Sequence, residues 1–249
     1  MHRLSVEEFR KAHKLPIIVV LDDVRSLYNV GSVFRTSDAF RVEEVYLCGI
    51  TATPEDVMCD GEVIKTASLK ASQEIHKTAL GAEESVAWQY FQDTKTAVES
   101  LKMNGYTVLA IEQCHGSTML EDFAASQETR GYAIIFGNEV NGVRQDVVDA
   151  CDGCLEIPQY GTKHSLNVSV TAGIVIHHLA SLLQLQSTEG EEEDGTVGKA
   201  CYGINGIVSL DIDGREAEKE EGQRESCRPA PHTQLHNDKH DEGGNGYMA

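Results

Sequence analysis

YAIIFGNEVNGV, residues 132–143, runs from a continuous apolar segment directly into a polar turn that contains Gly137 and Gly142. A short apolar run of this kind is typical of a strand buried on both faces of a parallel sheet. Similar runs occur at residues 17–21, 45–48, 106–111 and 154–157. Helical patterns lie between them at residues 33–40, 94–103 and 145–150. Strands that alternate with helices predict an α/β fold with a parallel sheet.

Three further segments complete the predicted organisation. A short N-terminal helix is expected over Ser5–Lys14, opened by a capping box of Ser5 and Glu8. Pro54–Gln73 is polar and without a clear period, so we expect an extended loop or insertion there. From Ser187 the chain becomes acidic and of low complexity, a composition typical of disorder. The predicted units are therefore an N-terminal helix at 1–16, one domain at 17–186 and an acidic tail at 187–249.

The charge of the chain restricts how it can bind nucleic acid. The formal net charge is −19, and the 63 residues of the tail carry 15 of the 40 acids but only 6 of the 21 bases. The remaining residues are still acidic. Because phosphate contacts require Lys and Arg, an RNA site would have to be a local basic patch and could not depend on the overall field of the protein.

Composition also argues against a membrane protein and a disulfide framework. No run approaches the ~18 apolar residues that a membrane span needs, and the first 16 residues lack the apolar core of a secretion signal. We therefore expect a cytoplasmic protein. The seven cysteines are scattered, and Cys151 and Cys154 form a single CxxC without a second ligand pair. We predict two reduced, partly buried thiols and no metal, with a zinc or redox protein as the alternative.

The first segment whose residues could bind a ligand or take part in catalysis is residues 21–40, LDDVRSLYNVGSVFRTSDAF. A strand end leads through a polar turn into a helix expected to begin near Asn29. Gly31 would allow close backbone approach at the helix start, where free N–H groups can receive a polar ligand. Arg35 lies less than two turns further along the helix. The alternative is an ordinary helix cap followed by a surface arginine.

Two other segments also place polar residues at the end of a predicted strand or the start of a predicted helix. Gly137, Asn138 and Glu139 follow a buried strand, and the carboxyl ends of parallel strands are the usual ligand sites of α/β sheets. A nucleotide P-loop is disfavoured because its glycine pattern and lysine are missing, although a simple tight turn remains an alternative. In residues 155–183, LEIPQYGTKHSLNVSVTAGIVIHHLASLL, Ser165 and Asn167 place polar side chains at the start of a mostly apolar helix. Such polar groups require partners, and a ligand could supply them.

The three segments, in this order, resemble the signature motifs of the SpoU/TrmH family of RNA 2′-O-ribose methyltransferases in the SPOUT superfamily. NVGSVFRTSDAF resembles the first motif, FGNEVNGV the second and IPQYGTKHSLNVS the third, and KTALGAEESV (77–86) resembles the segment that follows the first motif. The resemblance covers roughly residues 15–185. Gln159 departs from it, because relatives commonly carry methionine after the Ile-Pro pair.

This resemblance implies a parallel-sheet fold with a C-terminal trefoil knot, and composition or periodicity could not have predicted a knot. It implies that S-adenosyl-L-methionine binds within the knot and that the protein works as a homodimer. The implied cofactor-binding residues are Gly137, Ile157, Leu166 and, more loosely, Glu112. The implied catalytic residues are Asn29, Arg35, Glu139, Ser165 and Asn167.

The function expected from the resemblance is methylation of a ribose 2′-hydroxyl in RNA. Arg35 is expected to organise the phosphate and the hydroxyl, because an arginine is too basic to act as a general base. Because the core begins by residue 17, we expect no separate N-terminal RNA-binding domain. By family analogy alone, this favours tRNA over rRNA as the substrate. A non-catalytic knotted RNA-binding protein is the alternative. Candidate RNA contacts are Arg10, Lys11, Lys14, Arg35, Arg41, Arg144 and Lys163.

Overall fold

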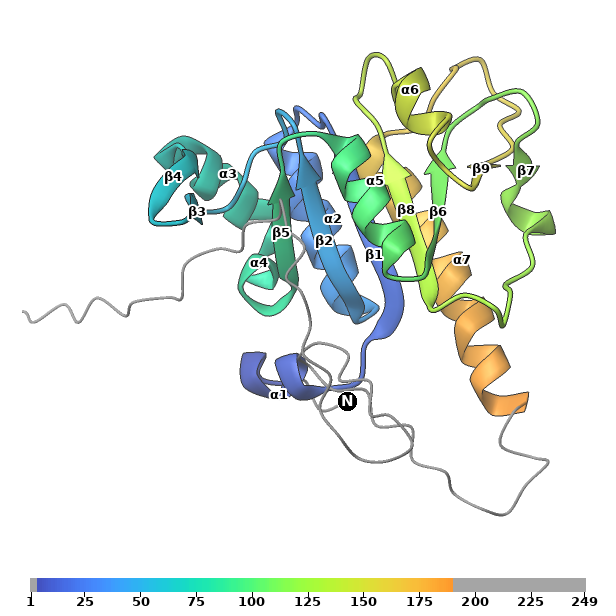
Figure 1. Cartoon of the computed structure of the whole chain (residues 1–249), viewed down its shortest axis with the longest axis horizontal. Coiled ribbons are helices and arrows are strands. Elements are labelled where there is room, and N and C mark those ends of the chain that lie inside the picture. Colours follow the sequence, from blue (N-terminus) through green and yellow to red (C-terminus); the bar gives the residue numbers. More distant parts are fainter. Residues whose placement is uncertain (1–3, 190–249) are drawn as a thin grey trace, which may run out of the picture.

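The computed structural model describes residues 4–189, at whose centre lies a seven-stranded parallel sheet (Figure 1). Its strands are β1 (Leu15–Asp22), β2 (Val42–Cys48), β5 (Ala87–Phe91), β6 (Tyr106–Ile111), β7 (Thr118–Met119), β8 (Gly131–Phe136) and β9 (Gly153–Glu156). They are ordered β5-β2-β1-β8-β6-β9-β7, with every neighbouring pair parallel. The predicted α/β class is confirmed, and each predicted strand is present. Strands β5 and β7 were not predicted.

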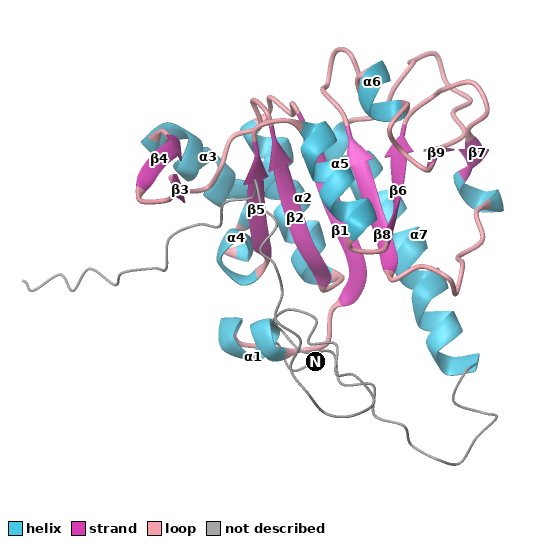
Figure 2. Ribbon diagram, in the orientation of Figure 1, coloured by secondary structure: helices cyan, strands magenta, loops and turns pink. Residues whose placement is uncertain are grey.

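Helices cover both faces of the sheet: α5 lies in front of it in Figure 2, and α2 and α7 lie behind it. The helices are α1 (Val6–Lys11), α2 (Leu27–Ala39), α3 (Leu69–Ala79), α4 (Ala82–Ser85), α5 (Thr94–Met103), α6 (Gln145–Val148) and α7 (Val168–Glu189), with a 3₁₀ turn at Leu120–Asp122. Ile17, Val19 and Leu21 of β1 join the core that includes α2 and α7. Ile18 and Val20 face the second core, which includes α5. A continuous apolar run is required because each residue is buried on one face or the other.

The N-terminal helix has the predicted capping box. The Ser5 side chain accepts a hydrogen bond from the Glu8 backbone, and the Glu8 side chain accepts one from the Ser5 backbone. The helix ends at Lys11, earlier than expected, and Lys14 instead donates to the carbonyl of Phe9 and lies over its ring. The predicted disordered tail lies outside the described residues, apart from the end of α7.

The prediction of an extended loop over Pro54–Gln73 was wrong. This stretch contains an antiparallel hairpin of β3 (Val57–Cys59) and β4 (Glu62–Lys65), followed by the first residues of α3. The strands of the hairpin are short and mostly exposed, so their sequence shows no alternation of buried and exposed positions. Lys65 attaches the hairpin to the core by donating to the Gly49 carbonyl and lying over the Tyr90 ring.

The end of the fold brings distant segments together. Helix α7 contacts α2 and β1, whereas the preceding strand β9 pairs with β6 and β7. The connection at residues 157–167 therefore crosses the carboxyl end of β8, which lies between β1 and β6. Within residues 4–189, none of the helices has the length and apolar character required to span a membrane.

Candidate active site at the carboxyl ends of β1 and β8

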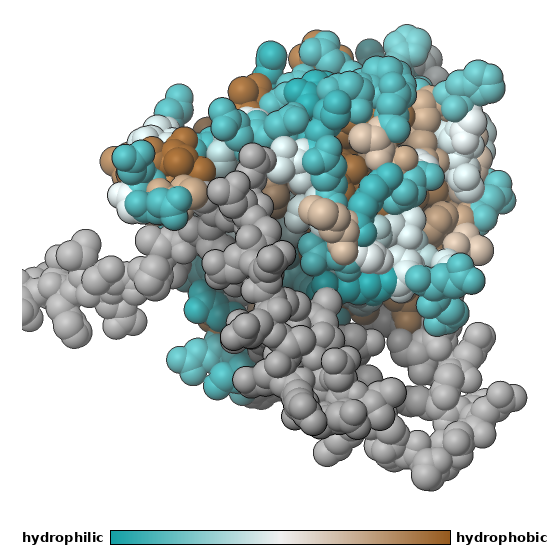
Figure 3. Space-filling view, viewed as in Figure 1, coloured by the Kyte–Doolittle hydropathy of each residue, from teal (hydrophilic) through white to brown (hydrophobic). Residues whose placement is uncertain are grey.

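The three motif segments meet where the central strands end. Strands β1 and β8 are parallel neighbours, with Leu21 opposite Phe136. The turn after β1 and the turn after β8 consequently leave the sheet side by side, at the upper edge in Figure 1. Hydrophilic residues cover most of this edge in Figure 3. Carboxyl ends of parallel strands are where α/β proteins bind ligands.

Glu139 joins the first two segments through its carboxylate. One oxygen accepts from the backbone N–H of Ser26 (2.9 Å) and the side-chain amide of Asn29 (3.0 Å), and the other accepts from the backbone N–H of Arg25 (3.0 Å). Partial burial alone would raise the pKa of Glu139, but these hydrogen bonds outweigh it and lower the pKa below its ordinary value. Glu139 is therefore an anion whose oxygens are already occupied, which disfavours it as a general base.

Asn29 extends this connection to the third segment. Its side chain is buried near the start of α2, and its Oδ1 accepts from Nδ2 of Asn167 at 3.2 Å. Asn167 in turn accepts through its Oδ1 from the backbone N–H and the hydroxyl of Ser169, so Asn167 caps the first turn of α7. A chain of hydrogen bonds thus runs from Ser169 through Asn167 and Asn29 to Glu139. Asn29 donates to the charged Glu139, and Asn167 accepts from the Ser169 backbone while it donates to Asn29. These hydrogen bonds fix the orientation of both asparagine side chains.

The turn after β8 is closed by its own backbone. Asn138 and Gly142 exchange two backbone hydrogen bonds, and the buried Asn138 side chain donates to the carbonyl of Asp23 at 2.8 Å. Gly142 has a φ of +68°, and a Cβ atom at Gly137 would lie 2.1 Å from backbone atoms of Gly142 and Val143. Both positions therefore require glycine. Sequence reasoning passed over the structural role of Asn138, although the Asn141–Gly142 pair in the same segment is a recognisable turn signal.

Glu112 ties the end of β6 to the same turn. Its carboxylate accepts from the backbone N–H of Val143 (3.0 Å) and of Gln113 (2.9 Å). Glu112 thus supports the turn that contains Gly137. This is a direct physical link between two of the predicted cofactor-binding residues.

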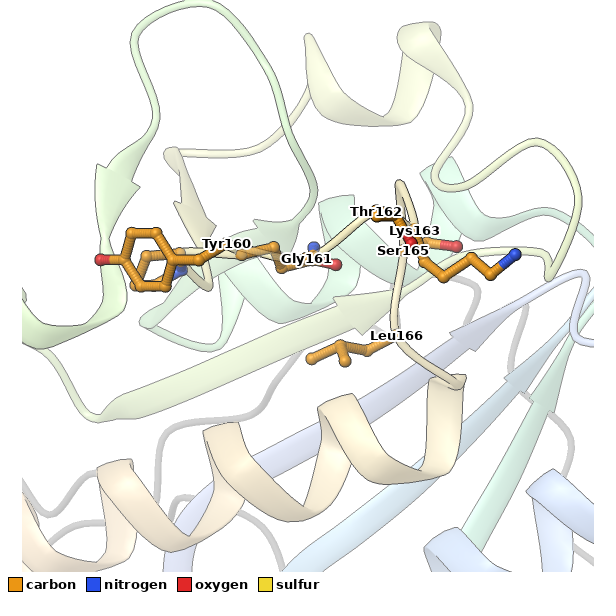
Figure 4. Close-up of a pocket in the computed structure, with 8 residues that line it drawn as sticks. Tyr160, Gly161, Thr162, Lys163, Ser165 and Leu166 are labelled. Atoms are coloured by element: carbon orange, nitrogen blue, oxygen red, sulfur yellow. The ribbon is translucent and has the colours of Figure 1, made fainter.

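The third segment encloses a hollow of about 320 Å³ (Figure 4). The hollow is lined by Pro158, Gln159, Tyr160, Gly161, Thr162, Lys163, Ser165 and Leu166. Ser165 and Leu166 are exposed in it, whereas Ile157 is partly buried and packs against the core. Of the four predicted residues in this segment, Ser165 and Leu166 line the hollow, whereas Ile157 and Asn167 do not.

Arg35 is exposed and lies apart from the hydrogen-bonded chain. It is six residues beyond Asn29, about 9 Å along the helix axis. It makes no hydrogen bond or ion pair within the described residues, so its guanidinium is available to a ligand there.

Two predictions about the first segment were wrong. Helix α2 begins at Leu27, capped by the Ser26 side chain, rather than near Asn29. Gly31 serves helix packing instead of ligand approach, since a Cβ atom there would lie 2.3 Å from the carbonyl oxygen of Ile75 in α3. Asn29 therefore lies within the first turn of α2, where it can face the turn after β8.

The CxxC thiols have the predicted character. Cys151 is partly buried, Cys154 is buried, and both are free. Burial raises the pKa of each thiol to about 12. Because thiolates are the species that bind metals and react, these residues are poor candidates for zinc or redox chemistry.

Comparison with known proteins agrees with this geometry. The fold and the three converging segments define an α/β protein with a ligand site at the carboxyl edge of a parallel sheet. Residues 16–177 match the model of the SpoU rRNA Methylase family, and the chain belongs to that family. It is 30% identical over 165 residues to the 23S rRNA (guanosine-2′-O-)-methyltransferase RlmB of Neisseria meningitidis, covering 65% of this chain and 56% of the relative. The chain thus spans less than two thirds of that relative's length.

Solved structures share the fold. The TrmH/SpoU tRNA modifying enzyme of A. aeolicus superimposes with a TM-score of 0.58 at 20% identity, covering 76% of this chain and 87% of that one. The AdoMet-bound rRNA methyltransferase of Sinorhizobium meliloti gives a TM-score of 0.55 at 21% identity, covering 70% and 59%. At these identities the likeness establishes the architecture alone.

Proposed function

We propose that the chain transfers the methyl group of S-adenosyl-L-methionine to a ribose 2′-hydroxyl of RNA. The observation that carries this proposal is the hydrogen-bonded chain Glu139–Asn29–Asn167, which joins the three family motifs at one edge of the sheet. Family membership and the 2′-O-methyltransferase among the relatives support the reaction type.

The residues present fit this cofactor. The turn after β8 packs so tightly on itself that only glycine fits at position 137, and Leu166, 40% exposed, offers an apolar surface for a flat ring. Ser165 and the backbone of the same loop offer polar contacts around the hollow. Gly137 and Leu166 would hold the cofactor, with Glu112 and Ile157 supporting them. When bound, S-adenosyl-L-methionine supplies an electrophilic methyl group.

The side chains of this chain would act mainly by positioning. Asn29, Glu139 and Asn167 hold the turn after β8 and the start of α7 in register, which keeps the acceptor hydroxyl in line with the methyl group. Arg35 would bind the RNA phosphate, since it has no partner within the described residues. Ser165, exposed in the hollow, would donate to the substrate. Glu139 holds its charge and takes up no proton, because its oxygens already accept three hydrogen bonds.

The proposal includes the C-terminal trefoil knot and a homodimer. The crossing of residues 157–167 over the end of β8 supports a threaded connection. Val170 and Ile174, one turn apart on α7, are 51% and 39% exposed, and an apolar stripe of this kind favours burial against a second copy. Sedimentation equilibrium of the wild type and of Ile174→Asp tests the dimer: we expect the variant to be monomeric, and an equally dimeric variant would move the interface elsewhere.

tRNA remains the favoured substrate over rRNA, and the cytoplasm the proposed location. The fold that the chain shares with the A. aeolicus tRNA modifying enzyme supports tRNA by analogy.

Mass spectrometry of nucleosides tests the reaction. The full chain is incubated with S-adenosyl-L-methionine and unmodified tRNA or rRNA in separate reactions. We expect a 2′-O-methylnucleoside in the tRNA fraction with the wild type, and its loss with Arg35→Ala. Cofactor binding without a methylated product in either fraction would favour the alternative, a knotted RNA-binding protein without catalysis.

A further inference from the structure

Seven of the fourteen Lys and Arg side chains among residues 4–189 are already engaged. They contact acidic, aromatic or carbonyl partners: Arg10, Lys14, Lys65, Lys77, Lys102, Arg130 and Arg144. Three of these, Arg10, Lys14 and Arg144, were predicted RNA contacts. On the motif segments, Arg25, Arg35 and Lys163 have side chains without an ion pair among residues 4–189.

Three phosphate contacts would make binding only weakly dependent on salt. For single-stranded RNA, log K falls with log salt with a slope of about −0.7 per neutralised phosphate, so three contacts give a slope of about −2. The protein is otherwise strongly acidic, with a net charge of −19. A contribution that does not depend on charge would add to the affinity that these three contacts supply.

Tyr160 can supply that contribution. Its side chain is 92% exposed on the rim of the hollow formed by the third motif. Figure 4 shows Tyr160 and Lys163 at opposite ends of this loop, pointing in different directions. One loop thus presents an aromatic ring at one end and an ammonium group at the other, beside Ser165 and Leu166. An exposed aromatic ring is the side chain on which unpaired bases stack.

We propose that Tyr160 is a stacking platform for an unpaired base adjacent to the methylated ribose, so that the substrate is single-stranded or looped RNA rather than duplex. This inference rests on the proposed function. In a duplex both faces of each base are covered by its neighbours, and Tyr160 could not reach them. In a loop a base can turn out onto the ring while Lys163 contacts a neighbouring phosphate.

Fluorescence anisotropy tests this with the full chain and a labelled oligo(A) of about twelve nucleotides, alone or paired with oligo(U). Tyr160→Ala should weaken binding to the single strand about tenfold, and Tyr160→Phe, which keeps the ring, should bind like the wild type. The duplex should bind more weakly than the single strand and respond little to Tyr160→Ala. The salt slope should stay near −2 in Tyr160→Ala and become shallower by about 0.7 in Lys163→Gln.

Three outcomes would overturn the inference: equal single-strand affinity of Tyr160→Ala and the wild type, tighter binding of the duplex, or a loss of affinity for S-adenosyl-L-methionine in Tyr160→Ala. The last would place the ring in the cofactor site. Methyl transfer by the wild type, measured on nucleosides, is a separate readout. If the wild type transfers no methyl group but binds the oligonucleotide through Tyr160, the proposed function fails and the stacking platform stands.

Discussion

Replacing Glu139 by glutamine tests whether the carboxylate holds the candidate site together. Glutamine keeps nearly the same shape but has one oxygen, so its NH₂ group would face either the N–H of Arg25 or the donors from Ser26 and Asn29. At least one charge-assisted hydrogen bond is lost and the others become neutral. A hydrogen bond to a charged group contributes roughly 1.5–3 kcal/mol. Because Glu139 is exposed to solvent, we take the lower part of that range, about 2 kcal/mol.

This loss should appear both in stability and in cofactor binding. For a domain of this size, about 2 kcal/mol lowers Tm by roughly 4–8 °C. The matched control is Glu128→Gln, which removes the same charge from an exposed side chain that makes no hydrogen bond within the described residues. Thermal unfolding by circular dichroism and titration with S-adenosyl-L-methionine are the assays. Equal Tm and equal cofactor affinity for the two variants would refute the role assigned to Glu139.

A positioning role also predicts a specific kinetic signature. Glu139→Gln should lower kcat/KM without removing a limb from its pH profile, because Glu139 neither donates nor accepts a proton in the proposed reaction. Disappearance of an acidic limb in the variant would instead identify Glu139 as a general base.

Three further changes have defined outcomes. Gly31→Ala should lower Tm by roughly 5 °C, because a Cβ atom at this position would lie 2.1 Å from Thr78 Oγ1. Gly173→Ala should instead stabilise α7 by up to about 1 kcal/mol, because a Cβ atom there would meet open space. A lower Tm for Gly173→Ala would indicate a partner surface on α7. Burial raises the pKa of Asp22, so its neutral form stabilises the fold below the unfolded pKa and this stabilisation is lost as pH rises through the folded pKa. The Tm of Asp22→Asn relative to the wild type should therefore rise between a pH below 3.8, the ordinary pKa of this carboxyl, and neutral pH, and a constant difference would contradict this. The pKa of Glu139 is lowered, so its effect on stability depends on pH in the opposite way. Its contribution to stability is present above the unfolded pKa and is lost as pH falls through the folded pKa. The Tm difference between wild type and Glu139→Gln should therefore disappear in acid.

The strands of the core were predictable because their burial leaves a direct mark in the sequence. Ile17–Leu21 and Tyr132–Phe136 are apolar at every position, since each residue faces one of the two helical layers. The β3–β4 hairpin was missed because its partly exposed strands do not produce a continuous apolar run. Helix α3 was also missed: its buried positions, Ala71, Ile75 and Ala79, have helical spacing, but two of the three are alanines, which contrast little with the polar residues between them.

The members of the site were predictable, whereas their connections were not. Asn29, Glu139 and Asn167 were identified because polar residues follow apolar strands or open an apolar helix, and because they match family motifs. Nothing in the sequence states that Glu139 accepts from Asn29 or that Asn29 accepts from Asn167. Those contacts follow from the sheet order, in which residues more than a hundred positions apart leave neighbouring strands at one edge.

The same order explains why one carboxylate can control the whole site. Strands β1 and β8 are adjacent, so the turns that follow them share donors and acceptors, and α7 returns across β8 to bring Asn167 within reach of Asn29. A residue at this crossing affects the turn after β8, the start of α2 and the start of α7 together. Arg35 lies on α2 and Tyr160 on the exposed rim of the crossing connection, and neither belongs to this hydrogen-bonded framework, so their substitution should change RNA binding while leaving the turn after β8 intact. The candidate site thus divides into an inner hydrogen-bonded framework that holds its shape and outer side chains that are proposed to meet the RNA.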